Sequence, residues 1–221
     1  MPKPVVQKIT QWSFSRFKDW QGCPRKAKYK HVDKLKEPGS SAMQRGSDIH
    51  KMAEDFLSGK LKVLPKELSS FEDEMIALRK RKPAVEADWA FDRQWQRVGW
   101  FDKEVWVRIK TDAASLLKKV VDVIDHKTGK EKPDHKDQMS LYGIGGFIVY
   151  PTALIARAKL WYLDLGKETV HEFERAELSQ LKEEWEDKVQ PMLNDTRFAA
   201  KPSHSCQWCH FRKSNGGPCE F

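Results

Sequence analysis

The segment VVDVIDHKTG, from Val120 to Gly129, constrains the fold of this chain more than any other feature. Its β-branched residues, bounded by a glycine, predict a strand. Because side chains of a strand alternate between two faces, Asp125 and Lys127 are expected on one face and His126 on the other. The strand would therefore place a carboxylate and an amine in the same small space.

The segments around this strand predict the rest of the fold. AVEADWAFDRQW and VWVRIKTDAASLL are also rich in β-branched and aromatic residues, and we expect them to pair with it in antiparallel fashion. ALIARAKLWYLDL and TVHEFER predict two more strands, joined at Gly166 and Lys167. Helical spacing and capping residues predict helices over residues 13–24, 40–59, 69–82 (capped by Ser69 or Ser70), 136–150 and 178–193. The expected fold is α/β, a mixed central sheet flanked by helices.

The length of 221 residues suits one domain with appendages. We expect a single domain over residues 1–221, with a core at about 83–175, an N-terminal helical part at 10–82 and a C-terminal helix and Cys-rich tail at 176–221. The 40 Lys and Arg exceed the 32 Asp and Glu, which gives a net charge of +8 and favours a polyanionic partner such as nucleic acid. The alternative is that this charge only maintains solubility.

The start of the chain and its cysteines bear on the compartment. The first residues, MPKPVVQKITQW, lack the apolar run of a secretion signal, and no stretch approaches the ~20 apolar residues of a membrane span. A cytoplasmic protein with no membrane contact is therefore expected. In a reducing compartment, four cysteines indicate metal binding or catalysis before disulfides.

Two acidic strand positions are candidates for a catalytic metal site. Asp112 ends the strand before Val120, and a short connection would bring it beside Asp125. Paired carboxylates supply the oxygen ligands that Mg²⁺ prefers, while a nearby amine such as Lys127 can orient the attacking water and offset charge on a phosphoryl group. This set is sufficient for phosphodiester hydrolysis. The alternative is an exposed salt bridge between Asp125 and Lys127.

An acidic residue ending one strand, followed by D-x-K on the next, resembles the PD-(D/E)XK nuclease superfamily. R-G-S-D-I-H at Arg45–His50 is similar to the R-G-x-x-x-H helix of its RecB-like exonuclease branch, which includes the iron–sulfur nucleases of CRISPR adaptation. The resemblance implies a restriction-endonuclease-like core in which His50 joins Asp112 and Asp125 at the metal, and a main-chain carbonyl near His126 completes the shell. The alternative for His50 is a helical histidine at a polar border.

Three further positions match this branch. Gln138 and Tyr142 lie four residues apart and so share one helix face. They resemble the family's Q-x-x-x-Y motif, which implies contact with DNA near the site. Glu86, on the first strand, corresponds to an acidic position of the family. The chain departs from the family pattern at IKTD, where a glycine is often found shortly before the acidic residue.

The four cysteines also follow the layout of this branch, with Cys23 before the core and Cys206, Cys209 and Cys219 after it. The resemblance implies that they hold a 4Fe-4S cluster, which would join the N-terminal helical part to the tail. Zinc is the alternative, bound by the same four sulfurs or by the three C-terminal cysteines with His204 or His210. A third alternative is accidental free cysteines.

The resemblance as a whole implies a Mg²⁺- or Mn²⁺-dependent DNA nuclease. It favours an exonuclease that acts on DNA ends or single strands, in recombination, repair or phage DNA metabolism, with any recombinase or helicase partner left open. The rivals are a structure-specific endonuclease and a non-catalytic DNA-binding protein built on an iron–sulfur or zinc site. Basic residues that could contact phosphates are expected near the cluster: Arg25, Lys26, Lys28, Lys30, Arg212 and Lys213. Aromatic residues expected there could stack on bases or pack around the cluster: Trp20, Tyr29, Trp208 and Phe211. RKRK at 79–82 is interpreted as a solvated helix end.

Overall fold

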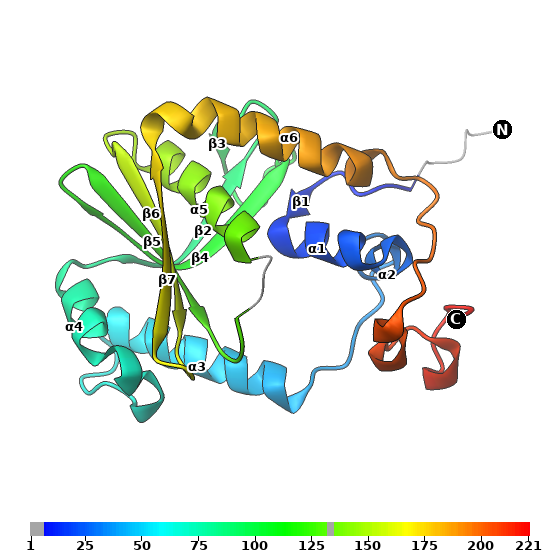
Figure 1. Cartoon of the computed structure of the whole chain (residues 1–221), viewed down its shortest axis with the longest axis horizontal. Helices are drawn as coiled ribbons and strands as arrows, with labels where there is room; N and C mark the ends of the chain where they lie inside the picture. The colour runs from blue at the N-terminus through cyan, green and yellow to red at the C-terminus, as the bar shows by residue number, and fades with distance from the viewer. Residues whose placement is uncertain (1–6, 132–134) are drawn as a thin grey trace. The chain divides into compact units, whose positions relative to one another are not determined.

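The computed structural model describes residues 7–131 and 135–221 and divides into two compact units. One unit is the continuous stretch Ser40–Glu183. The other combines the residues up to Gly39 with those from Glu184 to the C-terminus. Figure 1 shows the elements of both.

The unit Ser40–Glu183 is built on a mixed sheet in the order β3-β2-β4-β5-β6-β7. Neighbouring strands are antiparallel except β5 and β6, which are parallel and are connected through α5 (His135–Val149). This arrangement confirms the predicted α/β fold. The strands are β2 (Ala84–Phe91), β3 (Arg97–Val98), β4 (Val107–Leu117), β5 (Val120–Lys127), β6 (Ile155–Tyr162) and β7 (Lys167–Glu174).

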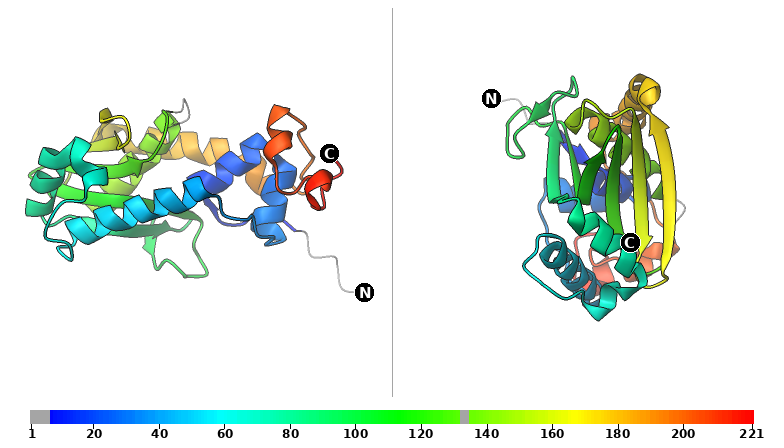
Figure 2. Two further views of the ribbon diagram at one scale, coloured as in Figure 1. Left: turned by 90° about the horizontal axis from the view of Figure 1, so that it is seen from below. Right: turned by 90° about the vertical axis from the view of Figure 1, so that its left-hand side faces the viewer.

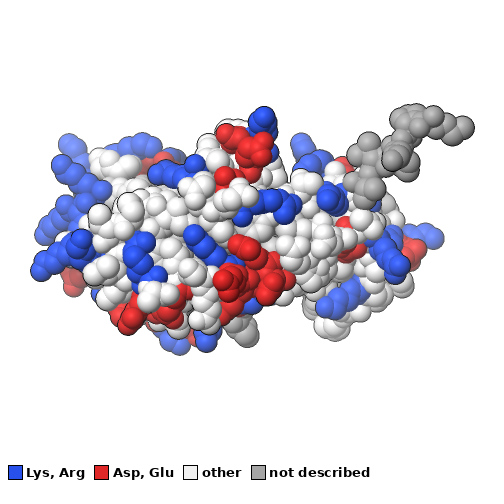
Figure 3. Space-filling view, turned by 90° about the horizontal axis from the view of Figure 1, so that it is seen from above, with Lys and Arg blue, Asp and Glu red and all other residues white. Residues whose placement is uncertain are grey.

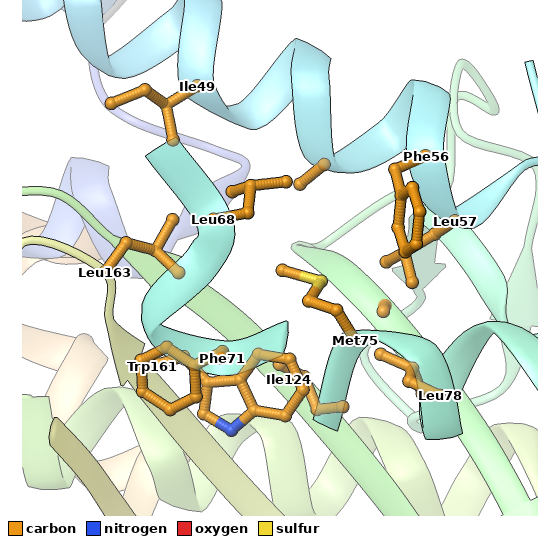
Figure 4. Packing of buried hydrophobic residues seen from close by; sticks show 12 residues of the cluster. Ile49, Phe56, Leu57, Leu68, Phe71, Met75, Leu78, Ile124, Trp161 and Leu163 are labelled. Carbon is orange, nitrogen blue, oxygen red and sulfur yellow. The ribbon is translucent and has the colours of Figure 1, made fainter. Parts of the chain in front are cut away.

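One face of this sheet packs against α3 (Ser41–Leu57), a 3-10 helix (Lys66–Phe71) and α4 (Glu72–Lys80). Figure 4 shows the buried side chains between them, among which Trp161 stacks on Phe71 with ring centroids 5.1 Å apart. The prediction that Ser69 or Ser70 caps the following helix was wrong. Phe71 is the N-cap, and Ser70 instead donates a hydrogen bond to the carbonyl of Leu163 at 2.8 Å.

The other face is covered by α5, and the sheet separates this helix from α3 and α4 (Figure 2). Glycines allow α5 to approach closely. A Cβ on Gly145 would lie 2.6 Å from the Trp89 ring, and one on Gly143 would lie 2.7 Å from Phe173. Trp89 is itself buried, so it has little room to move.

We therefore expect Gly145→Val to lower the free energy of unfolding by about 1–3 kcal/mol, the usual cost of overpacking a core. Urea unfolding followed by circular dichroism measures this change. Gly22→Val is the matched control, because a Cβ at that helical glycine meets nothing within 4 Å. Equal unfolding midpoints for the two variants would contradict the close approach of α5.

The unit formed by the chain ends contains β1 (Trp12–Ser13), α1 (Phe14–Gly22), α2 (Pro24–Ala27), a π-helical turn (Lys28–Val32) and most of α6 (Leu178–Asn194). Ser13 caps α1 as predicted, accepting a hydrogen bond from the Arg16 main chain at 3.4 Å. Trp12 stacks on Trp185 of α6 at 5.3 Å between ring centroids. The two ends of the chain thus share one small core.

No helix of the described residues is long and apolar enough to span a membrane.

Candidate metal and catalytic centre

The centre lies where β4 and β5 separate. Their ladder ends at the pair Ala113 and Ile124, so Asp112 and Asp125 are the next facing positions, on strands that are diverging. The Thr111 hydroxyl fills this fork by donating to the carbonyl of Ile124 at 2.9 Å. The two carboxylates therefore lie at an opening in the sheet, just beyond the last β4–β5 pair.

Glu86 reaches the same opening from β2. The β2–β4 ladder pairs Val85 with Ala113 and Ala87 with Thr111, which leaves Glu86 facing Asp112. The backbone of Glu86 has φ +48°, a left-handed conformation that costs a non-glycine residue on the order of 1–3 kcal/mol. Ligand atoms of His50, Glu86 and Asp112 all lie within 4.8 Å of one another.

Asp112 is held on both of its oxygens. One oxygen forms a hydrogen bond with His50 Nδ1 at 3.0 Å. The other accepts a hydrogen bond from the His126 main-chain N–H at 2.5 Å. Burial acts to raise the pKa of Asp112, but the hydrogen bonds from His50 and from the His126 main chain act in the opposite direction, and that pKa lies below its usual range. The same hydrogen bond raises the pKa of His50. Asp112 is therefore an oriented anion.

Asp125 and Lys127 belong to a closed ring of one ion pair and three hydrogen bonds, which includes two residues of α5. Lys127 Nζ lies 2.6 Å from Asp125 Oδ2 and donates to Gln138 Oε1 at 2.8 Å. Gln138 Nε2 donates to the Tyr142 hydroxyl at 2.7 Å, and that hydroxyl donates to Asp125 Oδ1. Burial and the negative charge of Asp125 raise the pKa of Tyr142 well above its usual value, so its proton stays in place.

The structure thus gives the acidic residues different neighbours. Among the described residues, the grouped ligand atoms belong to His50, Glu86 and Asp112, while the oxygens of Asp125 face Tyr142 and Lys127. Glu86, a secondary candidate in the sequence, lies in the group whose ligand atoms could hold a metal ion. Its left-handed backbone has no signal in the sequence, because the residue stands in an ordinary strand pattern.

His126 lies on the opposite face of β5, as strand alternation requires. Its side chain is 1% exposed, and neither ring nitrogen has a hydrogen-bond partner among the residues the structure describes. Its ring lies 5.6 Å from that of Trp161 and 6.1 Å from that of His50, measured between centroids. Burial lowers the pKa of this imidazole. His126 therefore packs as a neutral ring behind His50, and its main chain holds Asp112.

Arg45 and Gly46 anchor the helix that carries His50. Arg45 makes two contacts with Asp164, at 2.6 and 3.0 Å, and Asp164 also accepts the Gly129 N–H at 2.9 Å. A Cβ on Gly46 would lie 3.2 Å from Thr128 Oγ1. The first half of the R-G-S-D-I-H motif thus fixes α3 against the end of β5, and this fixes the position of His50.

Sequence reasoning missed three charged residues that support the centre. Asp164 accepts hydrogen bonds from Arg45, and Lys110 forms an ion pair with Glu86 at 2.9 Å. Asp122 is buried and forms ion pairs with Arg81 at 2.8 Å and Arg157 at 2.7 Å. Lys110 could have been found from alternation, since it shares a strand face with the acidic residue two positions later. The partners of Asp122 and Asp164 come from distant segments, so their roles had no local signal.

The four cysteines all belong to the unit formed by the chain ends, and each is partly exposed and free of a disulfide. Main-chain N–H groups point at two of them, from Lys201 to Cys23 Sγ at 3.5 Å and from Ser203 to Cys206 Sγ at 3.3 Å. Gly217 allows the tail to fold back, since a Cβ there would lie 2.3 Å from the Phe211 carbonyl. Among the described residues, no three of these sulfurs lie within 4.8 Å of one another.

The aromatic and basic residues expected near the cysteines differ in their burial and in their contacts. Tyr29 and Phe211 are buried against each other, with centroids 5.3 Å apart, whereas Trp208 is 67% exposed. Trp20 donates to Asp195 at 2.8 Å. Three of the lysines are paired with carboxylates: Lys26 with Glu37, Lys28 with Asp33, and Lys30 with Asp19 and Glu37.

Comparisons with known proteins bear on the family and the fold of the chain. The family model of the PD-(D/E)XK nuclease superfamily matches residues 11–116 and 108–214. The solved structure of a candidate exonuclease from Eubacterium rectale has the same fold at a TM-score of 0.52 and 13% identity, covering 94% of this chain and 87% of that one. The structure of SSO0001 aligns at a TM-score of 0.46 and 16% identity, covering 99% and 90%. No curated protein matches the chain significantly.

Proposed function

Because this chain belongs to the PD-(D/E)XK nuclease superfamily, we propose that it is a divalent-metal-dependent deoxyribonuclease, most consistent with an exonuclease acting on DNA ends or single strands. The observation that carries the proposal is the group of His50, Glu86 and Asp112, whose ligand atoms converge within 4.8 Å. It lies where β4 and β5 part, beside the residues that hold Lys127. The proposed setting is the cytoplasm, in recombination, repair or phage DNA metabolism.

The donor set fits the proposed metal. Two carboxylates and one imidazole suit Mn²⁺ or Mg²⁺, which prefer oxygen ligands and leave positions for water and a phosphate oxygen. We assign His50, Glu86 and Asp112 to the ion, with Asp125 and the main-chain carbonyl near His126 as further proposed ligands. When bound, such an ion polarises the phosphate and lowers the pKa of a water molecule.

The residues of the chain account for the remaining requirements of hydrolysis. Lys127 brings a positive charge next to Asp125, where it can orient a water molecule and offset charge on the phosphoryl oxygens. Gln138 and Tyr142 hold both groups, because each of the four side chains contacts two others in the ring. Such fixed positions reduce the reorganisation needed during the reaction.

A substrate assay tests this function. Linear and circular plasmid, and end-labelled single- and double-stranded oligonucleotides, are incubated with Mg²⁺, with Mn²⁺ and with EDTA. We expect metal-dependent loss of linear DNA with circular DNA spared. Cleavage of closed circles would favour a structure-specific endonuclease, and DNA binding without cleavage under any metal would favour the non-catalytic alternative.

We further propose that the four cysteines hold a 4Fe-4S cluster that joins the N-terminal helices to the tail. Zinc would accept the same thiolate ligands. The layout along the chain, with Cys23 before the nuclease core and Cys206, Cys209 and Cys219 after it, favours the cluster. Main-chain N–H groups near Cys23 and Cys206 support thiolates, because such hydrogen bonds stabilise sulfur charge.

Protein purified without oxygen is therefore expected to be brown, with broad absorption near ~400 nm and about four iron atoms per chain. Iron and zinc are measured by elemental analysis. The Cys23→Ser variant should lose most of the iron, while Ser205→Ala, a change in the same tail at a residue without a thiol, should retain it. A colourless protein with one zinc per chain would refute the cluster.

A further inference from the structure

Unpaired cations gather around a hollow between the end of α3 and α4. The hollow has a volume of about 600 Å³, and its lining includes Lys62, Arg79, Lys80 and Lys82 but one carboxylate, Glu72. Within the described part of the chain, none of these four cations forms an ion pair. Most cations near the centre do form one, for example Arg45, Lys110 and Lys127. We call this hollow the α3–α4 groove.

One of the cations is already fixed for binding. The Arg79 guanidinium lies over the ring of Phe56, 4.6 Å from its centroid. Phe56 is 3% exposed and packs toward Leu57, Met75 and Leu78, as Figure 4 shows. Stacking restricts the rotamers of the arginine while its N–H groups stay available at the edge. A phosphate would therefore meet an ordered donor in this groove.

The residues of the segment RKRK, at 79–82, have two different environments. Arg81 turns inward to the buried carboxylate of Asp122, at 2.8 Å. Arg79, Lys80 and Lys82 line the groove. The interpretation of this run as a merely solvated helix end is therefore incomplete, because an ion pair at its third position fixes the backbone from which the other cations project.

The groove is linked to the candidate centre by two elements. Phe56 follows His50 by six residues in α3, which is about 9 Å along a helix axis. Lys82 precedes Glu86 by four residues at the start of β2. A nucleic acid strand with one phosphate at the centre would have neighbouring nucleotides within reach of the groove.

We propose that the α3–α4 groove binds the phosphates of a nucleic acid strand beyond the reacting phosphate. This inference rests on the proposed nuclease function and adds a second contact region for its substrate. Four cations against one carboxylate complement a polyanion, and the apolar Leu64 and Ile76 in the lining offer contact to a base. The net positive charge of the chain does not by itself identify this region, because it is not spread evenly over the surface. On the face in Figure 3, for example, basic and acidic side chains are mixed.

The test compares two variants that each lose three positive charges. The groove variant is Lys62→Gln, Lys80→Gln and Lys82→Gln. It spares Arg79, whose loss would also disturb packing on Phe56. The control variant is Arg93→Gln, Arg97→Gln and Lys103→Gln, which lie after the opposite end of β2, in β3 and in the connection from β3 to β4. Fluorescence anisotropy measures binding of labelled single-stranded oligonucleotides, short and long, in EDTA over a range of salt concentrations.

For the long oligonucleotide, the groove variant should bind at least about tenfold more weakly at ~0.1 M salt. The slope of log K against log salt should fall by about 2, since each phosphate contact on a single strand contributes about 0.7. The control variant and the short oligonucleotide should change little. Thermal unfolding checks that both variants are folded.

Equal binding of the long oligonucleotide by groove variant and parent would overturn the inference, as would an equal loss for the short one. The same holds if a polyglutamate peptide binds the parent and is lost in the groove variant while oligonucleotide binding persists. That result would identify an acidic protein partner instead. A parent that binds DNA through the groove but cuts no DNA with any metal contradicts the proposed nuclease activity and leaves the groove result intact.

Discussion

Asp112→Asn is expected to reduce metal-dependent DNA cleavage by on the order of a thousandfold. Asp112 is the residue on which the centre depends most, because it contacts His50, receives the His126 N–H and faces both Glu86 and Asp125 across the strands. An asparagine has nearly the same shape and can still accept the main-chain hydrogen bond. It removes the negative charge, which both the metal and the orientation of His50 require.

Two measurements separate this effect from unfolding. Isothermal titration with Mn²⁺ should show weaker binding for Asp112→Asn, and circular dichroism should be unchanged. Asp88→Asn is the matched control, since Asp88 is exposed, lies two residues from Glu86 on β2 and is outside the proposed metal-binding group. The proposal for the centre fails if Asp112→Asn cuts DNA at the rate of the parent, or if the control loses as much activity.

Lys127→Met is expected to lower kcat by about 10²- to 10³-fold while Mn²⁺ binding and DNA binding remain. Methionine has a similar length and apolar stem, so the substitution removes chiefly the ammonium group. That group contacts Asp125 at 2.6 Å and Gln138 at 2.8 Å, but it is not a metal ligand. A loss confined to kcat therefore indicates a role at the reacting phosphate rather than in binding.

Single-turnover cleavage and titration with Mn²⁺ are measured on the same preparation of Lys127→Met. Lys119→Met provides the comparison, because Lys119 is exposed in the turn before β5, at the other end of the strand that carries Lys127. An unchanged kcat, or a loss of metal affinity as large as the loss of rate, would show that Lys127 does not have the assigned role.

Local periodicity predicted the parts of the centre that lie within one element. Strand alternation placed Asp125 and Lys127 on one face, and they are in contact. Helical spacing placed Gln138 and Tyr142 together, and they share a hydrogen bond. Periods of 2.0 and 3.6 residues follow from backbone geometry alone, so they can be read without knowing the neighbours of the element.

Contacts between elements were not predictable in this way. VVDVID contains two buried aspartates, but Asp122 is neutralised by Arg81 and Arg157 while Asp125 faces Lys127 and Tyr142. Nothing within the segment distinguishes an aspartate held by arginines from one that lies at the candidate centre. The distinction comes from the arginines, which are supplied by the end of α4 and by β6.

The sequence by itself determined the strand that carries D-x-K, the helix faces beside it and the family to which this chain belongs. Only the tertiary structure decided that Glu86 joins His50 and Asp112. That outcome depends on the register of β2 with β4 and on a left-handed backbone at Glu86, both fixed by packing across the sheet. The side chains of this group come from separate helices and strands. The relative placement of such elements is set by long-range packing rather than by local propensity.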